Sequence, residues 1–263
     1  MKKLTVQTVC NAMNRMAPKY LAEEWDNPGL LIGDPTQEIN KILIALDISD
    51  DIINNAIESN CQMIVTHHPM IFHSIKSIRT DLPLGNKIRK LIKNDIAVFA
   101  AHTNLDSAEG GVNDVLAEKL GLFDVKTFDE ELSLGRIGRL INEMTAEEFA
   151  KHVKKALHAD NVRLIKAGDF KIKKVGICGG AGSELISKAK FLGADAFVTG
   201  DVKYHEAQSA VENKIHVIDA GHFATEFPIV YALAENLREE FERLDILIEV
   251  IEDTTSKDFF TII

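Results

Sequence analysis

Residues 41–68, KILIALDISDDIINNAIESNCQMIVTHH, decide the fold, because they place a helical segment between two apolar runs of strand length. This order is typical of a βαβ unit, whose two strands lie parallel in one sheet. The second run stops at Thr66 and is followed by His67, His68 and Pro69. Neighbouring side chains on a strand face opposite sides, so two adjacent histidines act together only where the strand has ended.

The same plan recurs over residues 174–201, KVGICGGAGSELISKAKFLGADAFVTGD, with nearly the same segment lengths. Its second apolar run ends in Thr199, Gly200 and Asp201, where the first unit has a threonine and two histidines. The pattern favours one architecture used twice, although short strands also align by chance, and both interpretations stay open at this point.

A second correspondence lies downstream of each unit, where AVFAAHTNLD aligns with HVIDAGHFATE. The alignment matches His102 with His222 and also matches Asp106 with Glu226. Each half is therefore predicted to end a strand in a His-x-x-x-acid loop that enters a helix.

We expect an α/β protein of two related α/β lobes with mostly parallel sheets, because strands and helices alternate along both halves. The first lobe is assigned to residues 1–125 and the second to residues 126–263. Ser133–Leu140 is predicted to be a strand, and the tail from Ile246 alternates like a strand that completes one of the sheets. Such sheets bind ligands at the carboxyl ends of their strands, where the histidines are expected.

The composition is that of an ordinary globular protein, with 46% hydrophobic and 27% charged residues among 263. A formal net charge of -10 argues against a nucleic-acid partner, because such binding needs clustered Lys and Arg. The three cysteines form no CxxC pattern, which disfavours disulfides and a structural zinc site. Without a signal peptide or an apolar stretch of membrane-spanning length, we expect a cytoplasmic protein that does not enter a membrane.

Six side chains at predicted strand ends combine imidazole with carboxylate and lack thiolate, a set that suits divalent zinc, iron, manganese, cobalt or nickel. A lone histidine at a strand end is usually only solvated or hydrogen-bonded, but the repeated loop chemistry favours metal binding. Six ligands exceed the need of one tetrahedral ion, whereas two ions about 3.5–4 Å apart would use them. The six are His67, His68, His102, Asp106, His222 and Glu226.

Three further features are less specific. Asp201 and His205 lie where a helix begins after the second unit. They could lie near the site and either support its ligands or bind substrate. The alternative is that Asp201 is simply an acid placed favourably at a helix N-terminus. The glycine-rich residues 176–183 are neither a P-loop nor a complete GxGxxG motif, so a tight turn is predicted. Trp25, the only tryptophan, stands in a turn before a strand, and its spacing assigns it no function.

Five motifs in this order resemble the Nif-three-like family, whose members are often labelled GTP cyclohydrolase I type 2 homologues. The resemblance runs from about residue 5 to residue 260, in the compact form without the domain that some relatives insert in the middle of the chain. The motifs are EEWDNPGLLIGD, VTHHPMIF, AHTNLDSAEGGVND, TGDVKYHEAQ and DAGHFATE.

The resemblance implies two α/β lobes with a dinuclear metal centre in the cleft between them, and a ring-shaped homohexamer. It implies that Glu226 bridges two divalent ions and that His102 lies beside them as a proton-transfer or supporting group. The implied ligands are His67, His68, Asp106, His222 and Glu226.

Two kinds of function follow from this resemblance. The first is a metal-dependent hydrolase that resembles GTP cyclohydrolase and in which His102 or His205 moves protons to and from a small-molecule substrate. The alternative is a non-catalytic protein that binds or delivers metal or regulates another process.

Overall fold

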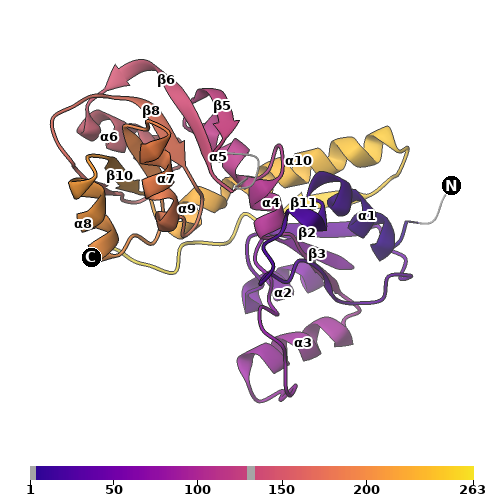
Figure 1. Cartoon of the computed structure of the whole chain (residues 1–263). Helices are drawn as coiled ribbons and strands as arrows, with labels where there is room; N and C mark the ends of the chain where they lie inside the picture. The colour runs from indigo at the N-terminus through magenta and orange to yellow at the C-terminus, as the bar shows by residue number, and fades with distance from the viewer. Residues whose placement is uncertain (1–3, 129–133) are drawn as a thin grey trace. The chain divides into compact units, whose positions relative to one another are not determined.

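The computed structural model of the protein describes residues 4–128 and 134–263 (Figure 1). The chain divides into two compact units, and each is an α/β sheet with helices on both faces, which confirms the predicted fold class. The first unit comprises Met1–Ala108 and Ile229–Ser256, and the second comprises Glu109–Pro228 and Lys257–Ile263.

The first unit holds a five-stranded sheet in the order β1-β4-β3-β2-β11. The pairs β2 with β3, β3 with β4, and β2 with β11 are parallel, and only β1 runs antiparallel to its neighbour, so the βαβ prediction from residues 41–68 is confirmed. The tail completes this sheet as β11, as expected. The strands are β1 (Gly29–Ile32), β2 (Lys41–Ala45), β3 (Met63–Thr66), β4 (Ala97–Ala100) and β11 (Glu249–Glu252).

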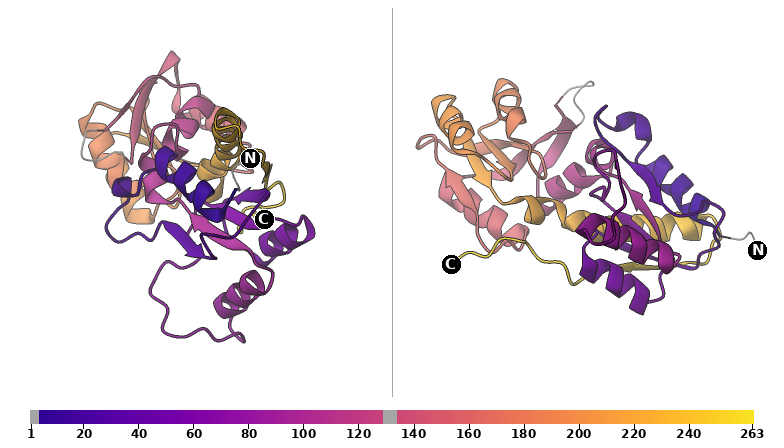
Figure 2. Two further views of the ribbon diagram at one scale, coloured as in Figure 1. Left: turned by 90° about the vertical axis from the view of Figure 1, so that its right-hand side faces the viewer. Right: turned by 90° about the horizontal axis from the view of Figure 1, so that it is seen from below.

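Helices cover both faces of this sheet (Figures 1 and 2). Leu43, Ile64 and Val98 pack with α2 (Asp50–Glu58) and α3 (Pro83–Lys93). The alternate residues of the same strands face the other side, where α1 (Val6–Met16) and α10 (Pro228–Arg243) lie. A short 3-10 helix, η1 (Lys19–Leu21), precedes β1.

The second unit holds a six-stranded sheet in the order β5-β6-β8-β9-β10-β7. Its centre, β8-β9-β10, is parallel, and antiparallel strands are added on both sides. The strand predicted at residues 133–140 is β6, which runs further than expected, and Ser133 lies outside the described residues. The strands are β5 (Phe123–Thr127), β6 (Arg136–Met144), β7 (Arg163–Ile165), β8 (Ile172–Ile177), β9 (Ala196–Thr199) and β10 (His216–Asp219).

The helices of the second unit also form two layers. One layer packs α5 (Val112–Lys119) and α6 (Ala146–Ala156) against the sheet around Phe149. The other packs η2 (Ser183–Leu185), α7 (Ile186–Phe191) and α8 (Tyr204–Glu212) around Phe197.

The two sheets repeat one order of elements. The parallel strands β2, β3 and β4 alternate with α2 and α3, and β8, β9 and β10 alternate with α7 and α8. A five-residue helix follows the third strand in each case, α4 (Thr103–Ser107) in the first unit and α9 (His222–Glu226) in the second. This order agrees with the interpretation of an internal repeat.

The chain changes unit directly after each of these short helices, at Ala108 and at Pro228. Residues 229–256 therefore belong to the first unit, which differs from the single division predicted near residue 125. The reason lies in the pairing of β11 with β2 and in the ion pair of Arg15 on α1 with Glu240 on α10. Within residues 4–128 and 134–263, none of the helices has the length and apolar character needed to cross a bilayer.

Candidate functional site

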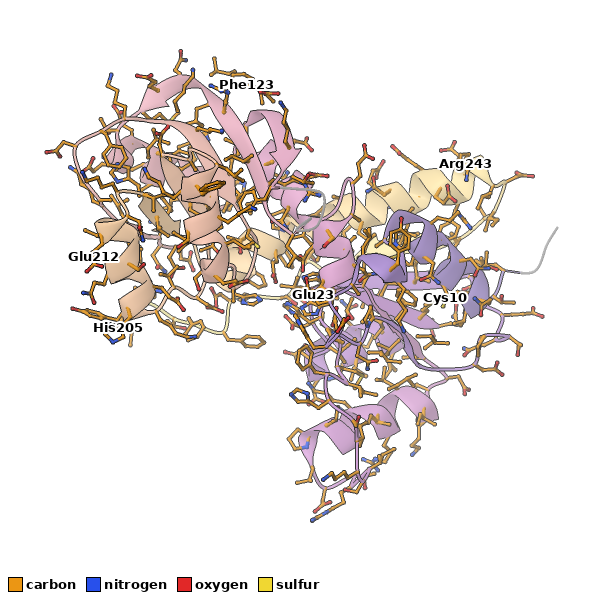
Figure 3. All side chains as sticks on the ribbon, in the orientation of Figure 1. Cys10, Glu23, Phe123, His205, Glu212 and Arg243 are labelled. Carbon is orange, nitrogen blue, oxygen red and sulfur yellow. The ribbon has the colours of Figure 1, made fainter. Side chains whose placement is uncertain are left out.

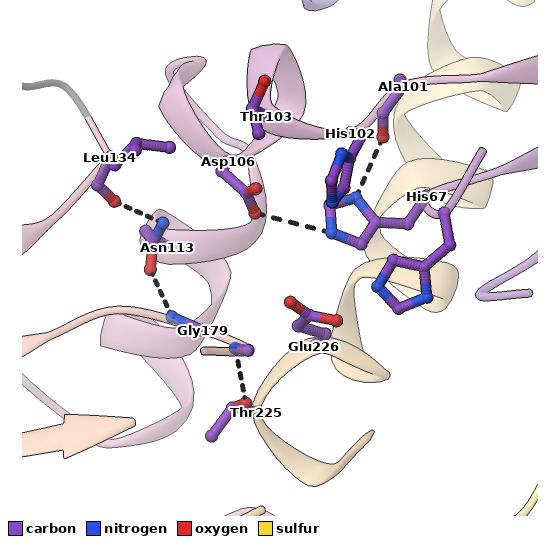
Figure 4. Close-up of polar contacts among 12 residues, drawn as sticks. His67, Ala101, His102, Thr103, Asp106, Asn113, Leu134, Gly179, Thr225 and Glu226 are labelled. Atoms are coloured by element: carbon purple, nitrogen blue, oxygen red, sulfur yellow. Dashed lines mark hydrogen bonds and ion pairs between the residues drawn. The ribbon is translucent and has the colours of Figure 1, made fainter. Parts of the chain in front are cut away.

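The first unit ends β3 in a tight turn that presents two histidines. The Thr66 hydroxyl donates a hydrogen bond to the carbonyl oxygen of His68 (2.9 Å), and the His68 amide donates to the Leu46 carbonyl (3.0 Å). His67 is buried, and its Nδ1 bonds to the Ala101 carbonyl oxygen at 2.9 Å (Figure 4). The backbone of His68 and the ring of His67 are thus held by residues that directly follow the neighbouring strands of the sheet.

His102 stands immediately before α4, where the third strand has ended. Its backbone N–H donates to Asn104 Oδ1 (2.9 Å), and its ring Nδ1 bonds to Asp26 Oδ1 (2.8 Å). The other oxygen of Asp26 accepts bonds from the amide and the hydroxyl of Thr103 (3.0 and 2.6 Å). Burial alone raises the pKa of the Asp26 carboxyl, but these hydrogen bonds outweigh burial and hold that pKa at about 2.

Three imidazoles converge in the first unit. Candidate ligand nitrogens of His67, His68 and His102 all lie within 4.8 Å of one another, so these rings are able to hold a metal ion. Asp106, on α4, adds a carboxylate whose Oδ1 lies 3.6 Å from His67 Nε2 (Figure 4). Two ligand atoms of one tetrahedral ion at normal bond lengths are about 3.4 Å apart, close to this spacing.

The second unit carries a ligand pair on α9. His222 and Glu226 are one helical turn apart, and their Nε2 and Oε2 atoms lie 3.1 Å from each other. Glu226 is buried, with 4% of its surface exposed, whereas His222 is half-buried.

Gly180 makes room for this pair. A Cβ atom at Gly180 would lie 2.1 Å from Glu226 Oε1 and 3.1 Å from His222 Nε2, and the backbone φ of +62° also favours glycine. The Gly180 amide donates to Thr225 Oγ1 (2.9 Å), which fixes the glycine turn against α9. The glycine-rich segment is a turn, as predicted, and it gives a buried carboxylate close access to the backbone.

Every imidazole of this set is anchored through the same ring atom. His67 Nδ1 bonds to the carbonyl oxygen of Ala101 at 2.9 Å. At 2.8 Å, the Nδ1 atom of His68 bonds to the Asp47 carboxylate, that of His102 to the Asp26 carboxylate, and that of His222 to the Asp201 carboxylate. Carbonyl and carboxylate oxygens only accept hydrogen bonds, so each Nδ1 carries the proton. In the neutral ring, Nε2 then has the lone pair that a metal ion requires.

The donor chemistry fits a divalent transition metal. Imidazole nitrogens oriented by oxygen acceptors, together with carboxylates and without thiolate, suit zinc and iron-group ions rather than a closed cysteine site. The structure therefore places His67, His68, His102 and Asp106 together in the first unit. It places His222 and Glu226 together in the second.

His205 has a different environment. It lies on the exposed face of α8, where Figure 3 shows its side chain among those that point outward, and its Nδ1 lies 3.4 Å from Gln208 Oε1. Among the described residues, no group with metal-ligand spacing includes it. A role for His205 in proton transfer stays a prediction.

Sequence reasoning missed Asp26, Asp47 and the clearance role of Gly180. Asp47 follows the carboxyl end of β2, at the edge where parallel sheets bind ligands, which is a signal for its function. Asp26 follows the only tryptophan, in a loop that resembles an ordinary turn.

Fold and site together define an α/β protein that carries histidine and carboxylate groups with metal-binding geometry. Residues 4–258 match the family model described as Duf34/NIF3 (NGG1p interacting factor 3), and the chain belongs to this family. The resemblance drawn from the five motifs is thereby confirmed.

Two curated relatives match nearly all of the chain. The GTP cyclohydrolase 1 type 2 homolog of Clostridium perfringens is 40% identical over 267 residues, with 99% of this chain and 100% of that one covered. The homolog of Halalkalibacterium halodurans is 29% identical over 377 aligned positions that cover both chains fully. This chain has 263 residues, so that relative carries additional residues and this chain is the compact form.

Solved structures agree with this assignment. A Bacillus cereus protein related to NIF3 has a TM-score of 0.94 at 27% identity, with all of both chains covered. Reduced HcgD from Methanocaldococcus jannaschii has a TM-score of 0.81 at 32% identity, with 96% of this chain and 98% of that chain covered.

Proposed function

We propose that the protein binds two divalent metal ions and uses them to hydrolyse a small molecule. The observation that carries this proposal is the common Nδ1 anchoring of four imidazoles, which prepares each Nε2 to bind a metal or, at His102, a proton. The proposed ligands are His67, His68, Asp106, His222 and Glu226.

Glu226 is the proposed bridging group, since Oε2 lies beside His222 Nε2 and Oε1 is the atom for which Gly180 leaves room.

Divalent ions at such a site lower the pKa of a bound water and polarise the group that is attacked. His102 is the proposed proton carrier, because Asp26 holds its Nδ1 and leaves Nε2 to accept or donate a proton. The carboxylate of Asp26, whose pKa is about 2, stays charged and would stabilise the imidazolium form of His102. His205 stays a second candidate for this role.

The names of the relatives suggest the first substrate to test, since the Clostridium perfringens protein is named a GTP cyclohydrolase 1 type 2 homolog. Hydrolytic opening of the guanine ring of GTP would be one instance of the proposed chemistry, and phosphodiesters and cyclic amides would be others. A cytoplasmic location and a ring-shaped homohexamer, implied by the family resemblance, belong to the same proposal. Light scattering after size-exclusion chromatography measures the oligomeric state.

The test compares wild-type protein with Glu226→Gln and with a matched control, Glu118→Gln, at an exposed position of α5. We expect two ions per chain by elemental analysis in wild type and control, and loss of at least one ion in Glu226→Gln. The three proteins would then be screened against GTP, phosphodiesters and cyclic amides.

Turnover by wild type and control, but not by Glu226→Gln, supports a hydrolase. Turnover that survives Glu226→Gln despite loss of metal overturns it. If no substrate is turned over and bound metal passes rapidly to an acceptor protein or chelator, the chain delivers metal and is not an enzyme.

A further inference from the structure

Two aromatic rings lie open to solvent in the first unit. Trp25 is 58% exposed and Phe72 is 40% exposed, and their ring centroids are 5.7 Å apart with an angle of 50° between the planes. The two loops that carry them are joined by a hydrogen bond from Asn27 Nδ2 to the Ile71 carbonyl (2.7 Å). Large aromatic side chains held together and exposed in this way often mark a ligand surface.

The exposed pair adjoins the imidazole cluster. Trp25 and Phe72 both meet the His102 ring edge to face, with centroids 6.0 and 6.1 Å away and interplanar angles of 73° and 74°. The His102 ring in turn lies 5.2 Å from His67 and 5.7 Å from His68. A ligand on the aromatic pair would therefore lie one imidazole away from the proposed metal ligands.

We propose that Trp25 and Phe72 form a stacking surface for a planar nitrogen heterocycle and so select the substrate class of this site. The ring would stack on the more exposed indole and meet the tilted Phe72 edge-on, which are the two geometries that aromatic pairs prefer. That the bound ring is a substrate rests on the proposed function, but binding of the ring to this surface does not require metal.

A heterocycle fits this surface better than an organic cation, which is the other usual ligand of exposed aromatic rings. Asp26, which adjoins Trp25 in the chain and bonds to His102, has a fully buried side chain, and both its oxygens are engaged by His102 and Thr103, so it offers no charge to a ligand. Divalent ions at the neighbouring ligands would also repel a cation.

The test uses the only tryptophan of the protein as a reporter of its own site. Inosine, a planar heterocycle without phosphate, would be titrated while Trp25 fluorescence is recorded, with ribose and tetramethylammonium as separate arms. The titrations would be run on metal-free and cobalt-loaded protein. The variants are Phe72→Leu, the conservative Phe72→Tyr, and Phe191→Leu at an exposed aromatic position on α7.

We expect a saturable change with inosine and none with ribose, in metal-free protein as well as in loaded protein. Phe72→Leu should weaken the apparent affinity about fivefold, whereas Phe72→Tyr and Phe191→Leu should leave it near the wild-type value. A missing response, an equal response to ribose, tighter binding of tetramethylammonium, or a Phe72→Leu variant that binds like wild type overturns the proposal. Failure of the metal proposal is recognised separately, because elemental analysis would then find no ions. The titration of metal-free protein would still show whether inosine binds to the aromatic pair.

Discussion

The carboxyl end of β3 and the carboxyl end of β9 have the same place in two halves of one plan, yet they carry different chemistry. His67 and His68 follow β3, whereas Gly200 and Asp201 follow β9. The first strand end supplies two of the proposed metal ligands. The second supports one, since Asp201 bonds to Nδ1 of His222.

The difference has a steric cause. A Cβ atom at Gly200 would lie 2.6 Å from two backbone atoms at the start of α9, the carbonyl carbon of Gly221 and the amide nitrogen of His222. The second unit therefore brings α9 so close to the end of β9 that no side chain fits there. The comparison teaches that the buried strands preserve the repeated topology, whereas the residues at the strand ends determine the chemistry.

The largest expected effect comes from Gly200→His, which gives the end of β9 the histidine that follows β3 in the first half. Backbone atoms at 2.6 Å cannot move aside as a flexible side chain would, so we expect the free energy of unfolding to fall by about 3 kcal/mol or more. Denaturant unfolding of the metal-free proteins measures this change.

Gly110→His is the control for that substitution. Gly110 has a φ of +70° and nothing within 4 Å of the added Cβ, so only the left-handed backbone should cost free energy, about 1–2 kcal/mol. Equal losses in the two variants would show that the close approach of α9 does not exclude a side chain from the end of β9.

Gly180→Ala tests whether the second half depends on backbone clearance for its carboxylate. The added methyl group would lie 2.1 Å from Glu226 Oε1, so we expect the carboxylate to be displaced and the metal affinity to fall by about 10- to 100-fold. Isothermal titration with a divalent metal measures this loss. Gly110→Ala has a similar φ and open space, and an equal loss of affinity in that variant would contradict the clearance argument.

Asp47→Ala and Asp201→Ala compare the groups that orient one imidazole in each half. Both aspartates bond to an Nδ1 atom at 2.8 Å, on His68 and on His222, so we expect each alanine variant to bind metal about tenfold more weakly. Asparagine at either position keeps an accepting oxygen and should restore most of the affinity. Metal titration of all four variants measures this, and alanine variants that bind like wild type would exclude an orienting role.

Much of the comparison could be predicted from the sequence, because it depends on local patterns. The apolar runs gave the parallel strands, and the spacing of His102 with Asp106 and of His222 with Glu226 placed each pair at one short helix. The orienting acids could not be predicted, because Asp26 lies 76 residues before the histidine that it holds.

The assignment of residues 229–256 to the first unit could not be predicted for a related reason. The pairing of β11 with β2, the Arg15–Glu240 ion pair and the bond of Arg238 on α10 to the Val250 carbonyl tie α10 to the first unit, and all three join residues far apart in the sequence or depend on that pairing. The role of Gly180 was equally hidden, since it depends on the Glu226 carboxylate that approaches it from 46 positions later in the chain.

The smallest expected effect concerns the first residue of the third strand, which is Ala97 in β4 and the buried His216 in β10. The Ala167 amide donates to His216 Nδ1 (3.1 Å) and the ring Nε2 donates to the Phe170 carbonyl (3.2 Å), a pattern that requires the neutral ring. Burial lowers the pKa of His216 below its usual 6.5, in agreement with these bonds.

The sign of the pH dependence follows from this lowered pKa. Below pH 6.5 the unfolded chain binds a proton at His216 that the folded chain does not, so acid favours unfolding by at most about 1.4 kcal/mol per pH unit until the folded pKa is reached. His216→Ala places the alanine of the first half at this position and removes this contribution of His216 to the pH dependence of unfolding. Its deficit in unfolding free energy relative to wild type should therefore shrink as the pH falls from 7.5 to 5.5. His205→Ala, at an exposed histidine, should show no such convergence, and a deficit of His216→Ala that stays constant over this range would mean that the ring titrates alike in both states.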